Sequence, residues 1–373
     1  MCSSDLRKSE ISYWSPVSRA YTIYRASSEG DLKGLPALAP GRNLRIKPFI
    51  AAGGVRAVGH DTFDRDLSVG VDVKVGITPS LTFDATIKPD FAQAEADEQQ
   101  VNLTQFSLFF PEKREFFLEN SGIFYIGDIP RNKRASSRFS PPEEDVLLFF
   151  SRRIGLSDAG EQLPLHGGAR LSGRAGAYGI GIMTMQSEAV DGRPATNYTV
   201  ARVRRDVLKS SDIGAILLSR QPSGSSGDFN RVAGFDANFR FFKGFSINSF
   251  GAKSDSPTAR GDETAGKIAI GWEDSLKRLG ASVMKIGEGF KDDIGFVRRT
   301  GVTRYFYDIA FLPQPAALRK RGIRQLQPHS RAFVYNDPSG TLVSRTIHIA
   351  NQTTFNDGSF TEYRSEEHTS ELQ

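Results

Sequence analysis

The chain has 373 residues, of which 39% are hydrophobic and 10% aromatic, with 36 glycines, 27 phenylalanines and one cysteine. Its 48 basic and 43 acidic residues leave a net charge of only +5, and the basic residues are scattered, which argues against nucleic-acid binding. No apolar run approaches the ~20 residues that a membrane-spanning helix needs. Spanning strands escape that test because they present only every second residue to lipid.

Both ends of the chain, residues 1–6 and 364–373, resemble translated sequencing adapters. We interpret them as artefacts and the chain as a fragment of a longer protein. Cys2 lies in the first of these segments, so the remainder has no thiol chemistry. Residues 7–43 contain several prolines and glycines and predict a periplasmic lead-in, or the end of a missing amino-terminal domain.

The first clear hairpin covers residues 66–89. The odd positions from Leu67 to Val75 are all apolar, whereas the even positions between them carry polar residues such as Asp72. After a short break the same alternation resumes. Because successive side chains of a strand point to opposite faces, this pattern predicts two strands with one apolar and one polar face.

The alternation stops in residues 90–164. A structureless connection of this length is uncommon within a compact domain and is usually functional or disordered. The segment contains too many phenylalanines for disorder. We therefore expect it to bury itself in the lumen of a barrel, as a plug or constriction.

This insertion and its borders carry several short motifs, in the order Pro89-Asp90-Phe91, Glu95-Ala96-Asp97, Phe110-Pro111-Glu112-Lys113-Arg114, Phe117-Leu118-Glu119 and Ser151-Arg152-Arg153-Ile154-Gly155. Together they resemble a family of bacterial outer-membrane proteins, the domain of unknown function 5916. The resemblance extends from about Glu29 to Arg298 and beyond, and it implies a membrane barrel behind a family-9-like carbohydrate-binding domain. It also implies a glycan ligand and no established reaction.

The insertion holds the densest group of charged residues, and three interpretations of them stay open. We favour an ion-pair network in a polar lumen over a calcium site made of carboxylate oxygens or a glycosidase-like pair of carboxyl groups. The candidate network consists of Asp90, Glu95, Asp97, Glu112, Lys113, Arg114, Glu115, Glu119, Arg152 and Arg153. No metal-protease, paired-cysteine or phosphate-loop motif is present, so we predict no cofactor, no metal and no catalytic residue.

Period-two alternation recurs to the end of the chain and predicts about fourteen strands. They lie near 44–58, 66–76, 80–89, 165–174, 177–187, 197–206, 211–220, 231–242, 244–253, 265–273, 278–287, 296–312, 328–336 and 341–355. Tight turns alternate with longer connections as far as 288–295, as periplasmic turns and external loops do in outer-membrane barrels. The connection 313–327 breaks this rule, so either one periplasmic connection is extended or a turn lies inside 296–312.

The sequence thus predicts an all-β fold, a partial antiparallel up-and-down transmembrane β-barrel over residues 44–363 with the plug-like insertion 90–164. Its partner would be outer-membrane lipid, and its function that of a pore-like or receptor-like protein of the bacterial outer membrane. One alternative is an envelope hydrolase that uses Glu112 and Glu119 on glycans. Another is a soluble β-sandwich adhesin, since sandwich strands also alternate.

Overall fold

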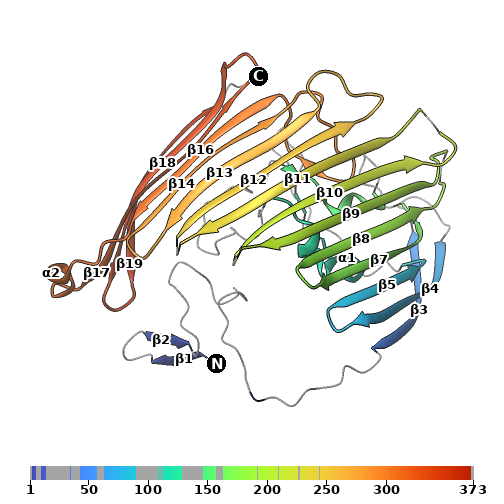
Figure 1. The fold of residues 1–373 in the computed structure, drawn as a ribbon, viewed down its shortest axis with the longest axis horizontal. Helices are drawn as coiled ribbons and strands as arrows, with labels where there is room; N and C mark the ends of the chain where they lie inside the picture. Colours follow the sequence, from blue (N-terminus) through green and yellow to red (C-terminus); the bar gives the residue numbers. More distant parts are fainter. Residues whose placement is uncertain are drawn as a thin grey trace.

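The computed structural model describes residues 2–5, 10–13, 34, 43–56, 63–89, 109–110, 112–127, 146–156, 163–190, 192–208, 210–225, 227–242 and 244–370. Most of them form one large antiparallel sheet (Figure 1). Its fifteen strands are β3 (Leu44–Arg56), β4 (Phe63–Thr78), β5 (Leu81–Ile87), β7 (Leu165–Ala175), β8 (Tyr178–Ser187), β9 (Thr196–Val207), β10 (Ser211–Pro222), β11 (Asn230–Phe241), β12 (Phe245–Asp255), β13 (Thr264–Glu273), β14 (Lys277–Ile286), β16 (Val302–Phe311), β17 (Ile323–Asn336), β18 (Leu342–Phe355) and β19 (Phe360–Ser370).

Each strand of this sheet pairs with the strand that follows it in the sheet, so the topology is up-and-down throughout. The predicted all-β antiparallel architecture is confirmed. The edge strands β3 and β19 do not pair with each other, so the sheet is not closed (Figure 1). Two smaller sheets have two strands each: β1 (Cys2–Asp5) with β2 (Glu10–Tyr13), and β6 (Val146–Leu147) with β15 (Phe296–Val297).

Connections at the two ends of the strands differ in length. At one end, the turn end, β4–β5, β7–β8, β9–β10, β11–β12 and β13–β14 are joined by two or three residues. At the opposite end, the loop end, the longer connections include the insertion 90–164 and residues 287–301. β16 runs uninterrupted from Val302 to Phe311. Of the two explanations for the long connection after this strand, the first therefore applies: one connection at the turn end, residues 312–322, is extended, and it contains α2 (Ala316–Arg319).

The two faces of the sheet differ in what covers them. We call the face that carries the insertion the inner face and the opposite one the outer face. On β11 the neighbours Phe235 and Asp236 show the contrast, because Phe235 is 65% exposed on the outer face and Asp236 only 3% exposed on the inner face. The apolar parity of the predicted alternation points outward, for instance at Tyr178 and Ile182 of β8 and at Ile268 and Ile270 of β13.

Two details differ from the sequence-based expectation. The predicted strand 296–312 is divided, since β15 pairs with β6 of the insertion and the large sheet resumes only at Val302. The fifteenth strand, β19, includes residues 364–370 of the tail that we interpret as foreign, so that boundary stays a prediction. Within the described residues, no helix is long and apolar enough to cross a membrane.

Candidate functional site

The insertion packs on the inner face of the sheet through short elements. They are α1 (Glu115–Leu118), a 3-10 turn at Ser121–Phe124, β6, and a second 3-10 turn at Ser151–Arg153. The approach is close at Gly181 of β8, where a Cβ atom would lie 2.2 Å from Cγ2 of Ile123. A larger residue there would displace the side chains of Ile123 and Phe124, which gives a physical reason for glycine at this position.

An apolar core joins the insertion to the sheet at the loop end of the strands. The insertion contributes Phe117, Phe124, Ile126, Val146, Leu148 and Ile154, and the inner face contributes Met183, Met185, Val200, Ile216, Leu218, Val232, Phe250, Met284 and Ile286. The polar face that the alternation predicts is therefore apolar in this half of the central strands. Buried charged residues of the inner face, such as Arg202 and Asp236, lie nearer the turn end, so the hydrophobic effect is the main force that holds the insertion at the loop end of the sheet.

A second segment, residues 287–301 between β14 and β16, also turns inward; we call it the strap. Phe290 and Ile294 of the strap belong to the same apolar core. The backbone N–H of Phe150 donates to the carbonyl of Ile294 at 2.8 Å, and β15 pairs with β6. The insertion therefore docks on the strap as well as on the strands.

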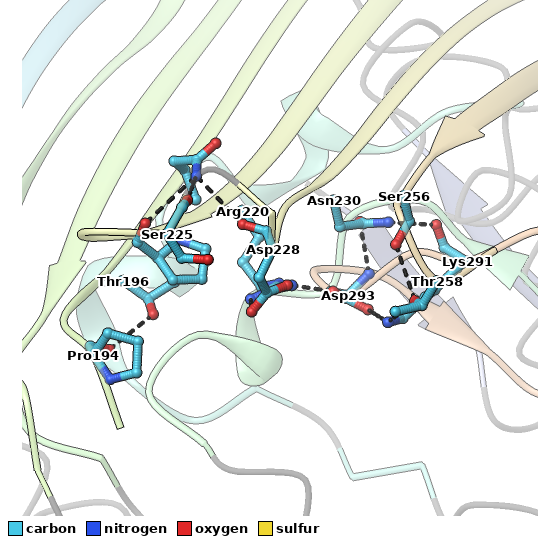
Figure 2. A network of polar contacts seen from close by, with 12 residues as sticks. Pro194, Thr196, Arg220, Ser225, Asp228, Asn230, Ser256, Thr258, Lys291 and Asp293 are labelled. Atoms are coloured by element: carbon cyan, nitrogen blue, oxygen red, sulfur yellow. Dashed lines mark hydrogen bonds and ion pairs between the residues drawn. The ribbon is translucent and has the colours of Figure 1, made fainter. Parts of the chain in front are cut away.

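Polar contacts fix the strap to the loop ends of the central strands (Figure 2). Nε of Arg220 lies 2.7 Å from Oδ2 of Asp293, and a second carboxylate, that of Asp228, pairs with the same guanidinium group. Asn230 donates to the carbonyl of Lys291 at 2.8 Å and accepts from the N–H of Asp293 at 3.0 Å. The strap is thus anchored to β10 by the ion pair of Arg220 with Asp293 and to β11 by Asn230, which bonds its backbone.

Glu112 and Arg114 form a clasp between the two described parts of the insertion. The Arg114 guanidinium donates from Nε and Nη2 to the two oxygens of Glu112, at 2.8 and 2.7 Å. It also donates to the carbonyls of Ile154 and Ser151, each at 2.7 Å, and the Ser151 hydroxyl donates to Glu112 at 2.7 Å. Burial alone would raise the pKa of Glu112, but the hydrogen bonds and charge of Arg114 outweigh it and hold that pKa below 4.5.

The clasp gives a pH prediction. Because the pKa of Glu112 is lower in the folded state, its stabilisation is present above pH 4.5 and is lost as pH falls through the folded value. We expect the protection of residues 112–118 from hydrogen exchange, relative to an unfolded chain at the same pH, to fall only in acid, at pH values below 4.5. A Glu112→Gln variant should exchange faster at neutral pH and lose this acid dependence. Equal acid dependence in both proteins would contradict the assignment.

Asp292 of the strap provides the control of opposite sign. Burial raises the pKa of its carboxyl group well above 3.8, and the N–H of Ile294 only partly offsets this. Its neutral form is favoured in the folded state, so stability declines as pH rises from 3.8 through the folded pKa. Asp292→Asn should therefore remove a pH dependence at the strap while leaving the acid response of the clasp unchanged.

Basic residues of the first strands reach the other carboxylates of the insertion. Nζ of Lys47 on β3 lies 3.0 Å from Oε2 of Glu115, and Lys74 on β4 pairs with Glu119. Arg170 on β7 bonds Asp84 at 3.0 Å and donates to the carbonyl of Glu119 at 2.7 Å. Glu115 and Glu119 thus pair with the inner face rather than with basic residues of the insertion.

A buried ion pair that the sequence analysis did not single out lies on the inner face between β9 and β11. Nη1 of Arg202 lies 2.7 Å from Oδ1 of Asp236, and both side chains are 1% exposed. Arg202 crosses β10 over Gly214, where a Cβ atom would come within 2.5 Å of the guanidinium group. Asp236 also accepts from the N–H of Gly127 at 3.1 Å and from Asn238 at 3.1 Å, so it fixes the end of the described first part of the insertion.

The remaining predicted network residues are more dispersed. The Arg152 guanidinium lies 5.7 Å from the ring centroid of Phe110, and burial lowers the pKa of Arg152. Lys113 is half-buried beside Glu112. Arg153 lies near enough to Asp292 for its positive charge to offset part of the rise in the pKa of that carboxyl group. Three of the predicted residues, Asp90, Glu95 and Asp97, lie outside the described residues. In the part of the chain that the structure covers, no group of three His, Cys, Asp or Glu side chains could hold a metal ion.

One family model matches part of the chain. Residues 40–209 match the family model described as Domain of unknown function (DUF5916), which confirms the predicted resemblance over β3 to β9 and the insertion. No curated protein sequence matches the chain.

Two solved porin structures are similar in outline. A BenF-like porin from Pseudomonas fluorescens Pf-5 shares 8% identity, with a TM-score of 0.34, over 88% of this chain and 93% of that chain. OccK8 (OprE) from Pseudomonas aeruginosa shares 11% identity, with a TM-score of 0.26, over 87% of this chain and 93% of that chain. At TM-scores this low neither similarity carries an argument, and the fold rests on the strand order and register of this chain.

Proposed function

We propose that this chain, whose residues 40–209 match DUF5916, forms the wall of a pore-like protein of the bacterial outer membrane and that its insertion obstructs the lumen. The observation that carries the proposal is the apolar outer face of a single sheet. Side chains more than half exposed occur on it from β3 to β18, among them Ile50, Leu67, Leu217, Phe235, Ile268 and Ile349. Contiguous apolar surface of this extent marks contact with another molecule or with a membrane.

Hydrocarbon accounts for this face better than a soluble sandwich does. A sandwich would cover the exposed side chains with a second sheet packed about 10 Å away. Among the described residues the other sheets have only two strands each, and β6 with β15 lies on the inner side. Leaving a large apolar side chain in water costs about 1.5–3 kcal/mol relative to burying it, so lipid is the partner that we propose.

Aromatic side chains on the outer face support the same assignment at the turn end. The rings of Phe239, Phe241, Phe245 and Trp272 lie in a row with successive centroids 6.0, 6.1 and 6.4 Å apart. The indole N–H of Trp272 donates to Asp274 in the turn at 2.7 Å, so its ring lies on the strand face and its polar atom points to the turn. Amphipathic rings in this orientation are typical of membrane–water interfaces.

Solute flux tests the proposal. We expect the full-length protein to require detergent for purification. In liposomes it should allow a small but measurable flux of small solutes. Phe124→Ala, which leaves a cavity where the insertion packs, should raise the flux severalfold. Phe235→Ala on the outer face is the matched control and should not. A protein that stays soluble without detergent, or equal flux in both variants, would reject the pore.

Two further ideas have less support. The family resemblance implies a glycan ligand delivered by a carbohydrate-binding domain, and a glycan panel probed with the full-length protein would test it. The hydrolase alternative needs a carboxyl group that stays protonated as general acid. Glu112 is instead held ionised by Arg114, which argues against that role.

A further inference from the structure

The inner face of the first strands carries an unusual juxtaposition of charges. In the register of β3 and β4, Arg45 lies directly opposite Lys74, and the next pair in line is Lys47 with Asp72. Like charges directly opposite each other destabilise a pair of strands. Unfavourable local arrangements such as this pair of like charges occur mainly at functional sites, where other interactions offset the loss of stability.

Carboxylates of the insertion supply much of the compensation for these like charges, beside Asp84 of β5, whose Oδ1 lies 4.0 Å from Nζ of Lys74. Glu115 lies 3.0 Å from Lys47, and Glu119 pairs with Lys74. The hydrogen bond and charge of Lys47 lower the pKa of Glu115, and the charges of Arg45 and Lys74 act in the same direction. This part of the inner face, which we call the basic strip, therefore binds two carboxylate groups that belong to a different segment of the same chain.

The contacts to the basic strip are exchangeable. The side chains of Lys47 and Glu115 are 47% and 78% exposed, and those of Lys74 and Glu119 are 29% and 46% exposed. Ion pairs this exposed contribute little to stability. The insertion is held by its apolar core and by the buried contacts of Arg114 and Asp236, so both carboxylates could leave the basic strip without displacing the insertion.

We propose that the basic strip, Arg45, Lys47 and Lys74, is a binding site for an anionic group of a solute, and that Glu115 and Glu119 occupy it until such a solute displaces them. The ligand is a small molecule with carboxylate or phosphate groups, because lysine and arginine side chains bind both. The inner face continues this character at β14–β17, where Arg278 and Arg331 lie 2.9 and 3.6 Å from the same carboxylate, that of Asp308. The proposal rests on the pore function for the entry of the solute.

Binding in detergent tests the site separately from transport. Titration calorimetry of the full-length protein with succinate and with inorganic phosphate distinguishes the two anion chemistries. Glu115→Gln/Glu119→Gln removes the internal competitor and should strengthen binding of at least one probe by roughly tenfold. Lys47→Gln/Lys74→Gln should abolish it. Lys253→Gln, on the outer face of β12, is the matched control and should leave the affinity unchanged.

The outcomes separate the two proposals. If the glutamine variant at Glu115 and Glu119 binds neither probe more tightly than the wild type, or if the lysine variant keeps its affinity, the basic strip is not an anion site. If binding follows the expected order while liposomes show no flux in any variant, the site stands and the pore function fails. Retained β-sheet circular dichroism in each variant excludes misfolding as the cause.

Discussion

Ile268→Arg should destabilise the protein in a lipid bilayer by ~2–4 kcal/mol, the cost of an arginine on the lipid-facing side of a barrel near the bilayer midplane. Ile268 lies at the middle of β13, on the outer face, and is 57% exposed. If hydrocarbon covers that face, the guanidinium group would have to stay in hydrocarbon or distort the bilayer to reach water. Urea titration of the protein folded into vesicles measures the change in the free energy of unfolding.

Ala269→Arg, one residue further along the same strand, is the control. Its side chain points to the inner face, where its partners across the neighbouring strands are Asn248 and Ser282. An arginine there meets polar groups and water in the lumen, so we expect a change well below that of Ile268→Arg. Equal destabilisation of the two variants, or none at Ile268, would contradict the assignment of the outer face to lipid.

Asp236→Ala should cost ~3–5 kcal/mol, the typical loss when one partner of a buried ion pair is removed. It leaves the Arg202 guanidinium buried without its carboxylate and removes acceptors from Gly127 and Asn238. Residues 121–127 should also exchange hydrogen faster, since Gly127 loses its bond to the inner face. The same urea titration, combined with hydrogen exchange, measures both effects.

The control is a double variant that removes both charges of the buried ion pair. Arg202→Met/Asp236→Leu replaces both charges by apolar side chains, which is often close to neutral for stability. We expect it to recover most of the loss, apart from ~1–3 kcal/mol for the unpaired N–H of Gly127. A double variant as unstable as Asp236→Ala would show that the charge of Arg202 is not the source of the cost.

The strands and their orientation were predictable because one physical rule acts along the whole sheet. A face exposed to an apolar environment requires apolar side chains at every second position, and residues 67–75 or 233–241 satisfy this without knowledge of their neighbours. The same local character made the tight turns recognisable. The glycines of β8 were also visible in the sequence, although the reason for Gly181, the approach of Ile123, depends on the insertion.

The apolar half of the inner face was missed because alternation was treated as uniform along each strand. Near the loop end both parities are apolar, as in the run Ile216-Leu217-Leu218 of β10. Such runs indicate a strand covered on both faces. The apolar run of β10 was therefore a visible sign in the sequence that both faces are covered there, and it marks where the insertion packs.

The contacts of the candidate site could not be predicted, since they join residues far apart in the chain. Arg202 reaches Asp236 across an intervening strand, and Lys47 and Lys74 meet Glu115 and Glu119 only because the insertion folds back toward β3 and β4. A sequence provides the charges but not the register that makes them neighbours. The acidic residues were therefore recognised as a group, while their partners on the inner face were not.

The strap also determines an order of assembly. Residues 146–150 dock on residues 294–297, which are synthesised much later, so the insertion has no complete partner while only the first half of the sheet exists. Contacts of such high sequence separation form slowly. Until β14 and β16 have joined, the apolar side chains of the insertion that pack on the strap and on these strands therefore stay uncovered. A chaperone that shields them in the interval would be expected to determine the yield of folded protein.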